Sequence, residues 1–332
     1  MIPILESMLP QPPPAPPPPT VELLLLWECK VGYPIEAVSI SSGGNYIAMV
    51  GDNYEDGCND VLYLLTSDGE LVWKKKFSEL FGSLGDWIHD VSISKNGNYI
   101  AVGSDDSTYL LQNDGTLLWE YENGESMNFV SISEDGGSIA VGTYDGWIHL
   151  LNHSGYEQWN YSTIGSVISV SISVDDEYVT CGDTRGYVYF FDKNGNLIWD
   201  EKIIDYSDMH ASASSEGEYI WVGVHYYGGQ LGLLNRSGDW VLPLINVNSS
   251  PEAISVPSGG ELLFVALGKY VDVYNLTAQA HVGSFEAREL VNDLDITLNG
   301  DYLVTGSDDM RVYFLQVELN AGYNGALNKF NI

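Results

Sequence analysis

Short runs of alternating apolar and polar residues recur along the chain. The clearest copy is NGNYIAVGSDDSTYLLQNDGTLLW (residues 96–119), and GGSIAVGTYDGWIHLLNHSGYEQW (residues 136–159) repeats its pattern about forty residues later. With Tyr99 as the anchor, the equivalent positions are Tyr46, Ser138, Tyr178, Tyr219, Leu262 and Tyr302. A period near 40 residues, in which strand patterns alternate with turns of Gly, Asn and Asp, is typical of a β-propeller.

Each copy predicts four short strands. The first is VSIS or a weaker version of it, at Val38–Ser41, Val91–Ser94, Val130–Ser133, Val170–Ser173, Ala211–Ser214, Ile254–Pro257 and Leu294–Thr297. Tyr99–Gly103, Thr108–Leu111 and Leu117–Trp119 represent the second, third and fourth strands. The tryptophan of the fourth strand recurs at Trp27, Trp73, Trp159, Trp199 and Trp240.

Seven copies predict an all-β fold, a seven-bladed β-propeller of four-stranded antiparallel blades. Trp27 marks a fourth strand that has no blade before it in the sequence. We therefore expect Leu23–Cys29 to lie beside Arg311–Val317 as the outer strand of the last blade, so that the N-terminal strand closes the ring. The predicted organisation is an apolar and proline-rich arm (1–20), the propeller (21–319) and a C-terminal tail (320–332).

Two segments resemble known repeat families. VSISKNGNYIAVGSDDSTYLL (residues 91–111) resembles the WD repeat, and LLQNDGTLLW (residues 110–119) resembles the end of a quinoprotein-type, PQQ-like repeat. The resemblance covers about Leu23 to Val317, although Leu-Leu or Phe-Phe replaces the Trp-Asp pair that names the WD family. It implies a propeller like those of archaeal surface proteins.

The quinoprotein likeness does not by itself imply an enzyme. In enzymes that bind pyrroloquinoline quinone the similar tryptophans are structural, and the cofactor occupies a separate central site. The adjacent Cys–Cys pair that many of those enzymes place over the quinone is missing here, as are a Gly-x-Ser-x-Gly elbow and a phosphate-binding loop. We expect a non-enzymatic protein, and a quinone-dependent enzyme remains the third alternative.

Charge is strongly one-sided. The chain has 13 basic and 46 acidic residues, a formal net charge of −33. Such a surface repels nucleic acid and anionic membranes. The longest apolar run, LLLLW (residues 23–27), is far shorter than the roughly 20 residues of a membrane span. The first ten residues also lack the basic start of a secretory leader.

An acidic insertion, GDNYEDGCND (residues 51–60), lengthens the loop between the second and third strands of the first blade. Its carboxylates are Asp52, Glu55, Asp56 and Asp60, and hard oxygen ligands at such short spacing are suited to calcium. Calcium is the one cofactor that the sequence suggests. A solvated acidic loop is the simpler interpretation.

Loops between strands two and three, and between strand four and the next blade, share one face of a propeller, which we call the top face. The insertions KFSELFGSLGDW (residues 76–87) and VHYYGGQ (residues 224–230) join the acidic loop there. The residues before each VSIS predict a polar ring at the channel mouth, namely Glu36, His89, Asn128, Ile168, Met209, Glu252 and Asn292. Candidate partner-binding residues are Glu36, Phe81, Trp87, His89, Tyr226 and Tyr227, which could instead hydrate the channel and pack loops.

Five sequons fit an exported protein, at Asn152, Asn160, Asn235, Asn248 and Asn275. We therefore expect an extracellular or cell-surface glycoprotein. A disulfide between Cys29 and Cys58 is compatible with this location, because both cysteines are expected near the top face. Cys181 ends a predicted core strand, where a cysteine packs as an apolar residue.

The N-terminal arm suggests how the propeller is used. Gln11–Thr20 (QPPPAPPPPT) must be extended polyproline II, and the apolar stretch MIPILESML precedes it. An arm that enters the next copy makes a heterologous contact, which builds filaments when it does not close. We expect a self-assembling surface or pilus-like filament subunit. The alternatives are a monomeric scaffold that binds another surface protein or a peptide with its top face, and an arm that is only a linker.

Overall fold

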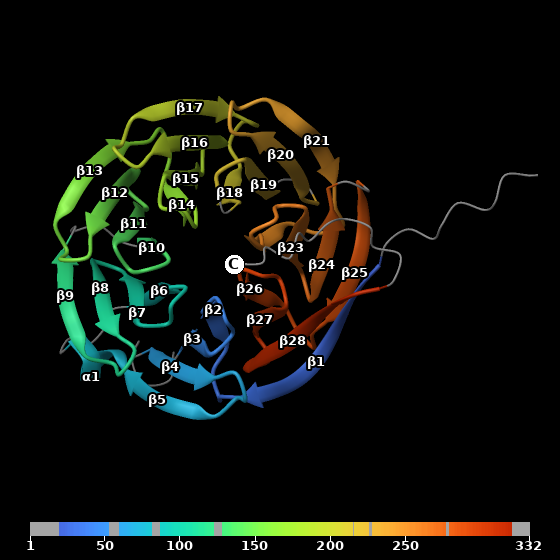
Figure 1. Ribbon diagram of the computed structural model, residues 1–332. Coiled ribbons are helices and arrows are strands. Elements are labelled where there is room, and N and C mark those ends of the chain that lie inside the picture. Colours follow the sequence, from blue (N-terminus) through green and yellow to red (C-terminus); the bar gives the residue numbers. More distant parts are fainter. Residues whose placement is uncertain are drawn as a thin grey trace, which may run out of the picture.

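Seven small sheets stand around a central axis in the computed structural model (Figure 1). The structure describes residues 20–52, 60–81, 87–122, 128–214, 216–225, 228–276 and 279–320. Every sheet has four antiparallel strands, in sequence order from the axis outwards in the first six blades. The predicted seven-bladed propeller is therefore confirmed.

The blades are numbered along the chain. Blade one contains β2 (Ile35–Ile40), β3 (Tyr46–Gly51), β4 (Val61–Thr66) and β5 (Leu71–Lys76). Blade two contains β6 (Ile88–Ile93), β7 (Tyr99–Ser104), β8 (Ser107–Gln112) and β9 (Leu117–Glu122). Blade three contains β10 (Asn128–Ile132), β11 (Ser138–Thr143), β12 (Trp147–Asn152) and β13 (Glu157–Ser162). Blade four contains β14 (Val167–Ile172), β15 (Tyr178–Asp183), β16 (Tyr187–Asp192) and β17 (Leu197–Lys202). Blade five contains β18 (Asp208–Ala213), β19 (Tyr219–His225), β20 (Gln230–Asn235) and β21 (Trp240–Asn246).

Blade six contains β22 (Pro251–Ser255), β23 (Leu262–Leu267), β24 (Tyr270–Asn275) and β25 (Ala280–Glu286). Blade seven contains β26 (Val291–Ile296), β27 (Tyr302–Ser307), β28 (Arg311–Leu319) and, outermost, β1 (Val21–Lys30). A five-residue helix, α1 (Phe77–Phe81), begins the insertion after blade one, where the sequence pattern showed no helix. In the described part of the chain, no helix is long and apolar enough to cross a membrane.

The N-terminal strand closes the ring. β1 pairs antiparallel with β28 from Val21 opposite Leu319 to Lys30 opposite Arg311, with one bulge between Leu25 and Trp27. Both ends of the propeller thus share blade seven, as the position of Trp27 predicts (Figure 1). Each sheet keeps two short edges, the innermost strand at the channel and the outermost strand at the rim.

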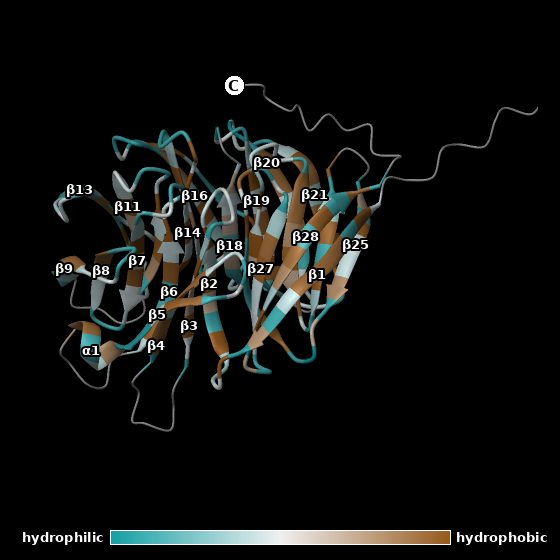
Figure 2. Cartoon of the chain, turned by 60° about the horizontal axis from the view of Figure 1, so that its bottom comes forward, coloured by the Kyte–Doolittle hydropathy of each residue, from teal (hydrophilic) through white to brown (hydrophobic). Residues whose placement is uncertain are grey.

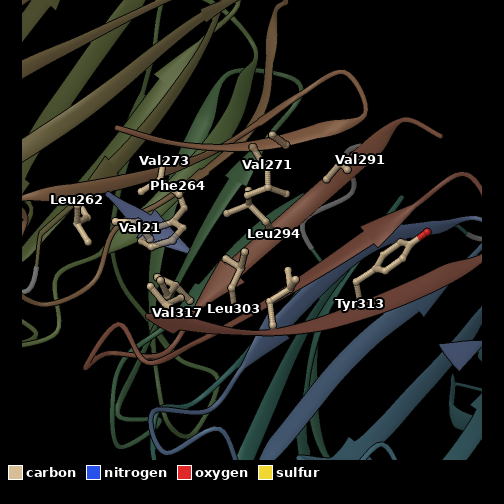
Figure 3. Close-up of a cluster of buried hydrophobic side chains, with 14 of the residues drawn as sticks. Val21, Leu262, Phe264, Val271, Val273, Val291, Leu294, Leu303, Tyr313 and Val317 are labelled. Carbon is tan, nitrogen blue, oxygen red and sulfur yellow. The ribbon is translucent and has the colours of Figure 1, made fainter. Parts of the chain in front are cut away.

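The apolar core is divided into seven separate layers. Each layer lies between two neighbouring blades, because a propeller blade presents both faces to its neighbours. The layer between blades six and seven also contains Val21 of β1, which packs with residues such as Phe264 and Leu294 (Figure 3). From the side, apolar residues follow the strands and polar residues the turns (Figure 2).

Tryptophans on the fourth strands join each blade to the next. Trp159 of blade three donates its indole N–H to the carbonyl of Lys193 in blade four at 3.0 Å. Its ring packs over Gly195, which has a φ of +82° and no room for a side chain. Four further tryptophans repeat this contact, Trp27 with Ser67, Trp73 with Asn113, Trp119 with His153 and Trp199 with Arg236.

Trp240 does not belong to this row, so the repeat assignment made for it from the sequence is wrong. In the β20–β21 pair Leu242, opposite Leu233, occupies the position that Trp199 has opposite Phe190 in blade four. Trp240, opposite Leu234, instead occupies the position that Leu197 has opposite Phe191, two residues earlier in the strand. Blade six has Gly283 at the same position, where a side chain would collide with the carbonyl of Val21.

The anchor tyrosines have a structural role of the same kind. A Cβ atom on Gly136 in blade three would lie 2.5 Å from the ring of Tyr99 in blade two, so only glycine fits beneath that ring. Blade three has Ser138 in place of the tyrosine, and blade four correspondingly has Asp176 in place of the glycine, with a φ of 57°. The Ser138 hydroxyl donates to Asp176 at 2.9 Å. The two exceptions to the repeat therefore compensate each other.

The tryptophan contacts predict a difference between two variants. Trp159→Leu should lower the free energy of unfolding by about 2–3 kcal/mol, because it removes an inter-blade hydrogen bond and a packed ring. Trp240→Leu should cost less than about 1 kcal/mol, since this side chain is exposed and outside the row. Chemical denaturation followed by circular dichroism measures both, and equal losses would contradict the assignment.

Candidate functional site

A cavity of about 290 Å³ opens along the axis of the ring, between the innermost strands. All seven of these strands, β2, β6, β10, β14, β18, β22 and β26, contribute lining residues. Carboxylates and histidines line it, and Lys95 is its one lysine or arginine among the described residues. This channel is the candidate site, because it is concave and polar groups from several blades converge on it.

Serines of the VSIS strands hold neighbouring blades together inside the channel. Each innermost strand is a sheet edge, so some of its N–H groups have no strand partner. The Ser131 hydroxyl of blade three accepts the N–H of Ile172 in blade four at 3.1 Å. The same bond joins Ser39 to Ile93, Ser92 to Ile132 and Ser171 to Ala213. These bonds explain why the serine recurs in the sequence.

Blade seven has Asp295 at the serine position. Its carboxylate accepts the N–H of Ile40 and the hydroxyl of Ser39 in blade one, both at 3.0 Å, and the hydroxyl of Ser255 in blade six. Asp295 was not among the residues predicted from the sequence, although its place in the repeat identifies it. It joins three blades at the point where the ring closes.

Two more aspartates act two residues earlier in their strands. Asp90 accepts the N–H groups of Val91 and, in blade three, Val130, both at 2.8 Å. Asp293 accepts those of Leu294 and, in blade one, Val38 at 2.7 Å. The three channel aspartates Asp90, Asp293 and Asp295 therefore accept N–H groups of the inner strands.

These contacts do not continue around the whole ring. Serine or aspartate bonds from one blade to the next run from blade seven through blade one to blade five, as do the tryptophan contacts. Between blades five and six and between blades six and seven, the described residues show no side-chain oxygen that accepts an N–H group of the next inner strand. They also show no fourth-strand tryptophan that donates to a turn carbonyl of the next blade there. Trp221 replaces them between blades five and six, where its buried indole donates to the carbonyl of Gly260 at 3.3 Å.

Burial shifts the protonation of several channel groups. It raises the pKa of Asp90 to about 7, the Asp295 carboxylate adds to the rise, and the two backbone N–H groups oppose it. Burial and the negative charge of Asp90 hold the pKa of Asp293 well above its usual range. Burial and the nearby His225 lower the pKa of His210 to about 4. His210 is therefore a neutral imidazole near pH 7.

Five of the seven predicted mouth residues do line the cavity, namely Glu36, His89, Ile168, Glu252 and Asn292. Each sits at a β-bulge between the first and second strands of its blade. Asn128 and Met209 are instead fully buried, in strands that have no bulge there, so their prediction as mouth residues is wrong. A bulge changes the face to which a side chain points.

An apolar residue before the mouth position is the sequence signal that distinguishes the bulged strands. The bulged strands have Ile35, Ile88, Val167, Pro251 or Val291 there, and each of these side chains is buried. Blade five has exposed Asp208 at that position, and Met209 fills the buried place instead.

The structure describes four of the six predicted partner-binding residues, and of these only Glu36 and His89 line the cavity. They lie on the neighbouring blades one and two, and His89 contacts Asp105 at 2.7 Å. The Phe81 ring stacks on Tyr109 of β8, with ring centroids 3.7 Å apart, so it packs against blade two. Trp87 is half-buried at the start of blade two. Tyr226 and Tyr227 lie outside the described residues.

The predicted calcium loop is described only at its two ends. Asp52 and Asp60 are 2% and 1% exposed, and Asp60 accepts the N–H of Ile88 at 2.7 Å. Glu55 and Asp56 lie outside the described residues. Within the described ranges, no three His, Cys, Asp or Glu side chains are grouped closely enough to hold a metal by themselves.

Glu36 lies beside Asp52. The pKa of Glu36 is raised to about 8. Burial is the largest cause, and the interaction with Asp52 and the negative charges of Asp60 and Asp308 raise the pKa further. No N–H or O–H group of the described residues donates to either carboxylate oxygen of Asp52.

The sequons differ in accessibility. Asn160 and Asn248 are exposed, whereas Asn152 and Asn235 are half-buried and accept backbone N–H groups of their own turns. Asn275 is 3% exposed, which argues against a glycan on it. Cys29 has a free thiol, its suggested partner Cys58 lies outside the described residues, and Cys181 is buried as expected.

The serine contacts can be tested with two matched variants. Ser131→Ala removes the acceptor of the Ile172 N–H and should lower the free energy of unfolding by about 1 kcal/mol. Ser212→Ala should change it by less than about 0.5 kcal/mol, because the Ser212 hydroxyl makes no hydrogen bond among the described residues, although the backbone of Ser212 pairs with β19. Urea denaturation compares the two, and the hypothesis fails if Ser212→Ala costs as much.

His210 predicts a pH effect. Its pKa rises from about 4 when folded to about 6.5 when unfolded, so the stability that its neutral form contributes is present above pH 6.5 and is lost as the pH falls towards 4. Between pH 7 and 5 the wild type should lose up to about 2 kcal/mol more than His210→Gln. Asp90 acts in the opposite direction but is present in both proteins. Denaturation curves measured at pH 5, 6, 7 and 8 test this, and a constant difference would contradict it.

Two family models match the chain. The model described as outer membrane protein assembly factor BamB matches residues 26–165 and 58–220. The model described as WD domain, G-beta repeat matches residues 278–314. A search of curated proteins found no match. Because the first model covers more than half of the 332 residues, the chain belongs to the family that this model describes, and it is a β-propeller of PQQ-like and WD40-like repeats.

Proposed function

We propose that the protein is a non-enzymatic cell-surface propeller that assembles with copies of itself, joined through Met1–Thr20. The observation that carries this proposal is the apolar rim of the ring. The outermost strand of each blade is a free sheet edge, and such edges accept a further strand.

Five of these outer strands carry exposed large apolar residues. β1, β5, β9, β17 and β21 expose side chains by 37% to 52%, at Leu25, Leu26, Leu71, Val72, Leu117, Leu118, Ile198, Trp240 and Val241. Single exposed leucines are ordinary, but adjacent apolar pairs repeated on successive edge strands are typical of an interaction surface. The rim therefore offers an apolar segment both backbone hydrogen bonds and apolar contacts.

Charge favours an arm contact over a contact between broad faces. Two copies of a chain with a net charge of −33 repel each other. Met1–Thr20 has a single charged residue, Glu6, together with the apolar stretch MIPILESML. The root of this segment is held at the rim of blade seven, where the Thr20 carbonyl accepts the N–H of Asn320 at 3.1 Å (Figure 1).

A surface location is part of the same proposal. The large acidic excess keeps a displayed protein soluble, and the exposed Asn160 and Asn248 are accessible to glycosylation.

The chemistry of the channel supports a role other than catalysis. Asp90, Asp293 and Asp295 each use both carboxylate oxygens to accept hydrogen bonds from the backbone or serines. Pyrroloquinoline quinone is a polyanion. This channel is lined by carboxylates, and of its described lining residues only Lys95 is a lysine or an arginine. The residues present do not fit that cofactor.

A second function is favoured by the open cavity. Its mouth presents Glu36, His89 and Glu252 on the top face, where a peptide or another surface protein could bind. The matching family is named for an assembly factor, which agrees with a scaffold role in either case. Alanine substitution of these three residues should weaken capture of such a partner without changing the size of the assembly.

Light scattering on the intact chain and on one that begins at Thr20 tests self-assembly. We expect the intact chain to form large assemblies, visible by electron microscopy, and the shortened chain to be monomeric, because only the arm offers an apolar contact with little charge repulsion.

A full-length variant in which Ile4, Leu5, Met8 and Leu9 are replaced by serine separates arm length from arm chemistry. It should also be monomeric, with an unchanged circular dichroism spectrum. A monomeric intact chain would overturn the self-assembly proposal and favour the top-face scaffold.

A further inference from the structure

Asp52 is a buried charge without compensation among the described residues. Its side chain is 2% exposed, and neither carboxylate oxygen accepts a hydrogen bond from the described residues. The cost of burying a carboxylate is large unless donors or an opposite charge compensate it. Other buried aspartates, such as Asp60 in the same blade and Asp183 in blade four, accept backbone N–H groups. Asp52 therefore differs from them in needing something that the described chain does not supply.

The groups around Asp52 increase this need. The carboxyl of Glu36, at the bulge of β2, lies beside it, and Asp60 and Asp308 act on Glu36 with the same sign. Asn292 donates to Asp308 at 2.8 Å and to the carbonyl of Ile35 at 3.0 Å, which places blade seven against this end of β2. The described residues thus bring acidic groups from two blades together at the channel mouth.

A single proton is a poor solution. A proton shared by Glu36 and Asp52 would give Asp52 a donor, but it would neutralise one of four carboxylates. A divalent cation compensates two charges, and solvent can reach the place because Glu36 lines the open cavity.

We propose that Asp52 and Glu36 bind a calcium ion at the channel mouth. Calcium takes six to eight oxygen ligands in flexible geometry, so water from the cavity can complete its coordination. Magnesium fits less well, because it demands near-ideal octahedral geometry.

The affinity should be low. No three acidic side chains of the described residues are grouped as a complete site, so most ligands must be water or backbone oxygens. Calcium sites of extracellular modules with few charged ligands have a Kd of about 10⁻⁴–10⁻³ M. This inference does not depend on self-assembly, since it concerns a single propeller.

Thermal unfolding of the full chain with and without calcium tests the site. At 10 mM calcium chloride the wild type should gain about 2–4 °C in Tm. Asp52→Asn should not respond. In calcium-free buffer with chelator, Asp52→Asn should unfold at the same or a higher temperature than the wild type, because the uncompensated charge is gone. The order of the two proteins should therefore reverse when calcium is added.

Asp68→Asn is the matched control, since Asp68 is exposed in a turn at the opposite end of blade one. It should keep the whole calcium response, which separates site binding from general screening of the acidic surface. Magnesium at equal ionic strength should give a smaller shift. A wild type that does not respond to calcium, or whose stability depends on pH alone, would overturn the proposal, as would an equal response in Asp52→Asn.

Discussion

Pairing of β1 with β28 is the interaction on which the rest of the ring depends. The apolar residues form seven separate layers, and each layer needs a blade on both sides. Without β1, blade seven would lose its outer strand, and Trp27 and Val21 would leave the layers towards blades one and six. One strand from the start of the chain therefore completes two junctions, which makes unfolding of the ends and of the ring a shared event.

Two bands of polar contacts reinforce the apolar layers. At the rim, indole N–H groups reach turn carbonyls of the next blade, and in the channel, serine or aspartate side chains reach N–H groups of the next inner strand. Both bands run from blade seven to blade five. The BamB-type model matches residues 26–165 and 58–220, which include most of this regular part of the chain. Between blades five and six and between blades six and seven, local solutions such as Trp221 and Gly283 take the place of these contacts.

Electrostatics gives the ring two distinct environments. The channel aspartates are acidic residues that the backbone itself satisfies, so their number does not indicate a binding site. Asp52 is different, because the described chain supplies no donor to its oxygens. At the rim, several outer strands carry adjacent apolar side chains that are exposed. Binding is therefore best sought at two places, the mouth of the channel and the outer edges.

The sequence alone determined the architecture. Its forty-residue period, the anchor tyrosines and the unpaired Trp27 gave seven blades and the strand that closes the ring, because each repeat must satisfy the same inter-blade contacts. Only the tertiary structure decided which side chains enter the channel. Bulges turn Glu36 and His89 into it, whereas the regular strands of blades three and five bury Asn128 and Met209. Side chains alternate with a period of two, so one extra residue reverses their direction. The proximity of Glu36 to Asp52 likewise depends on the bulge of β2 where it pairs with β3, and the repeat pattern does not reveal this bulge.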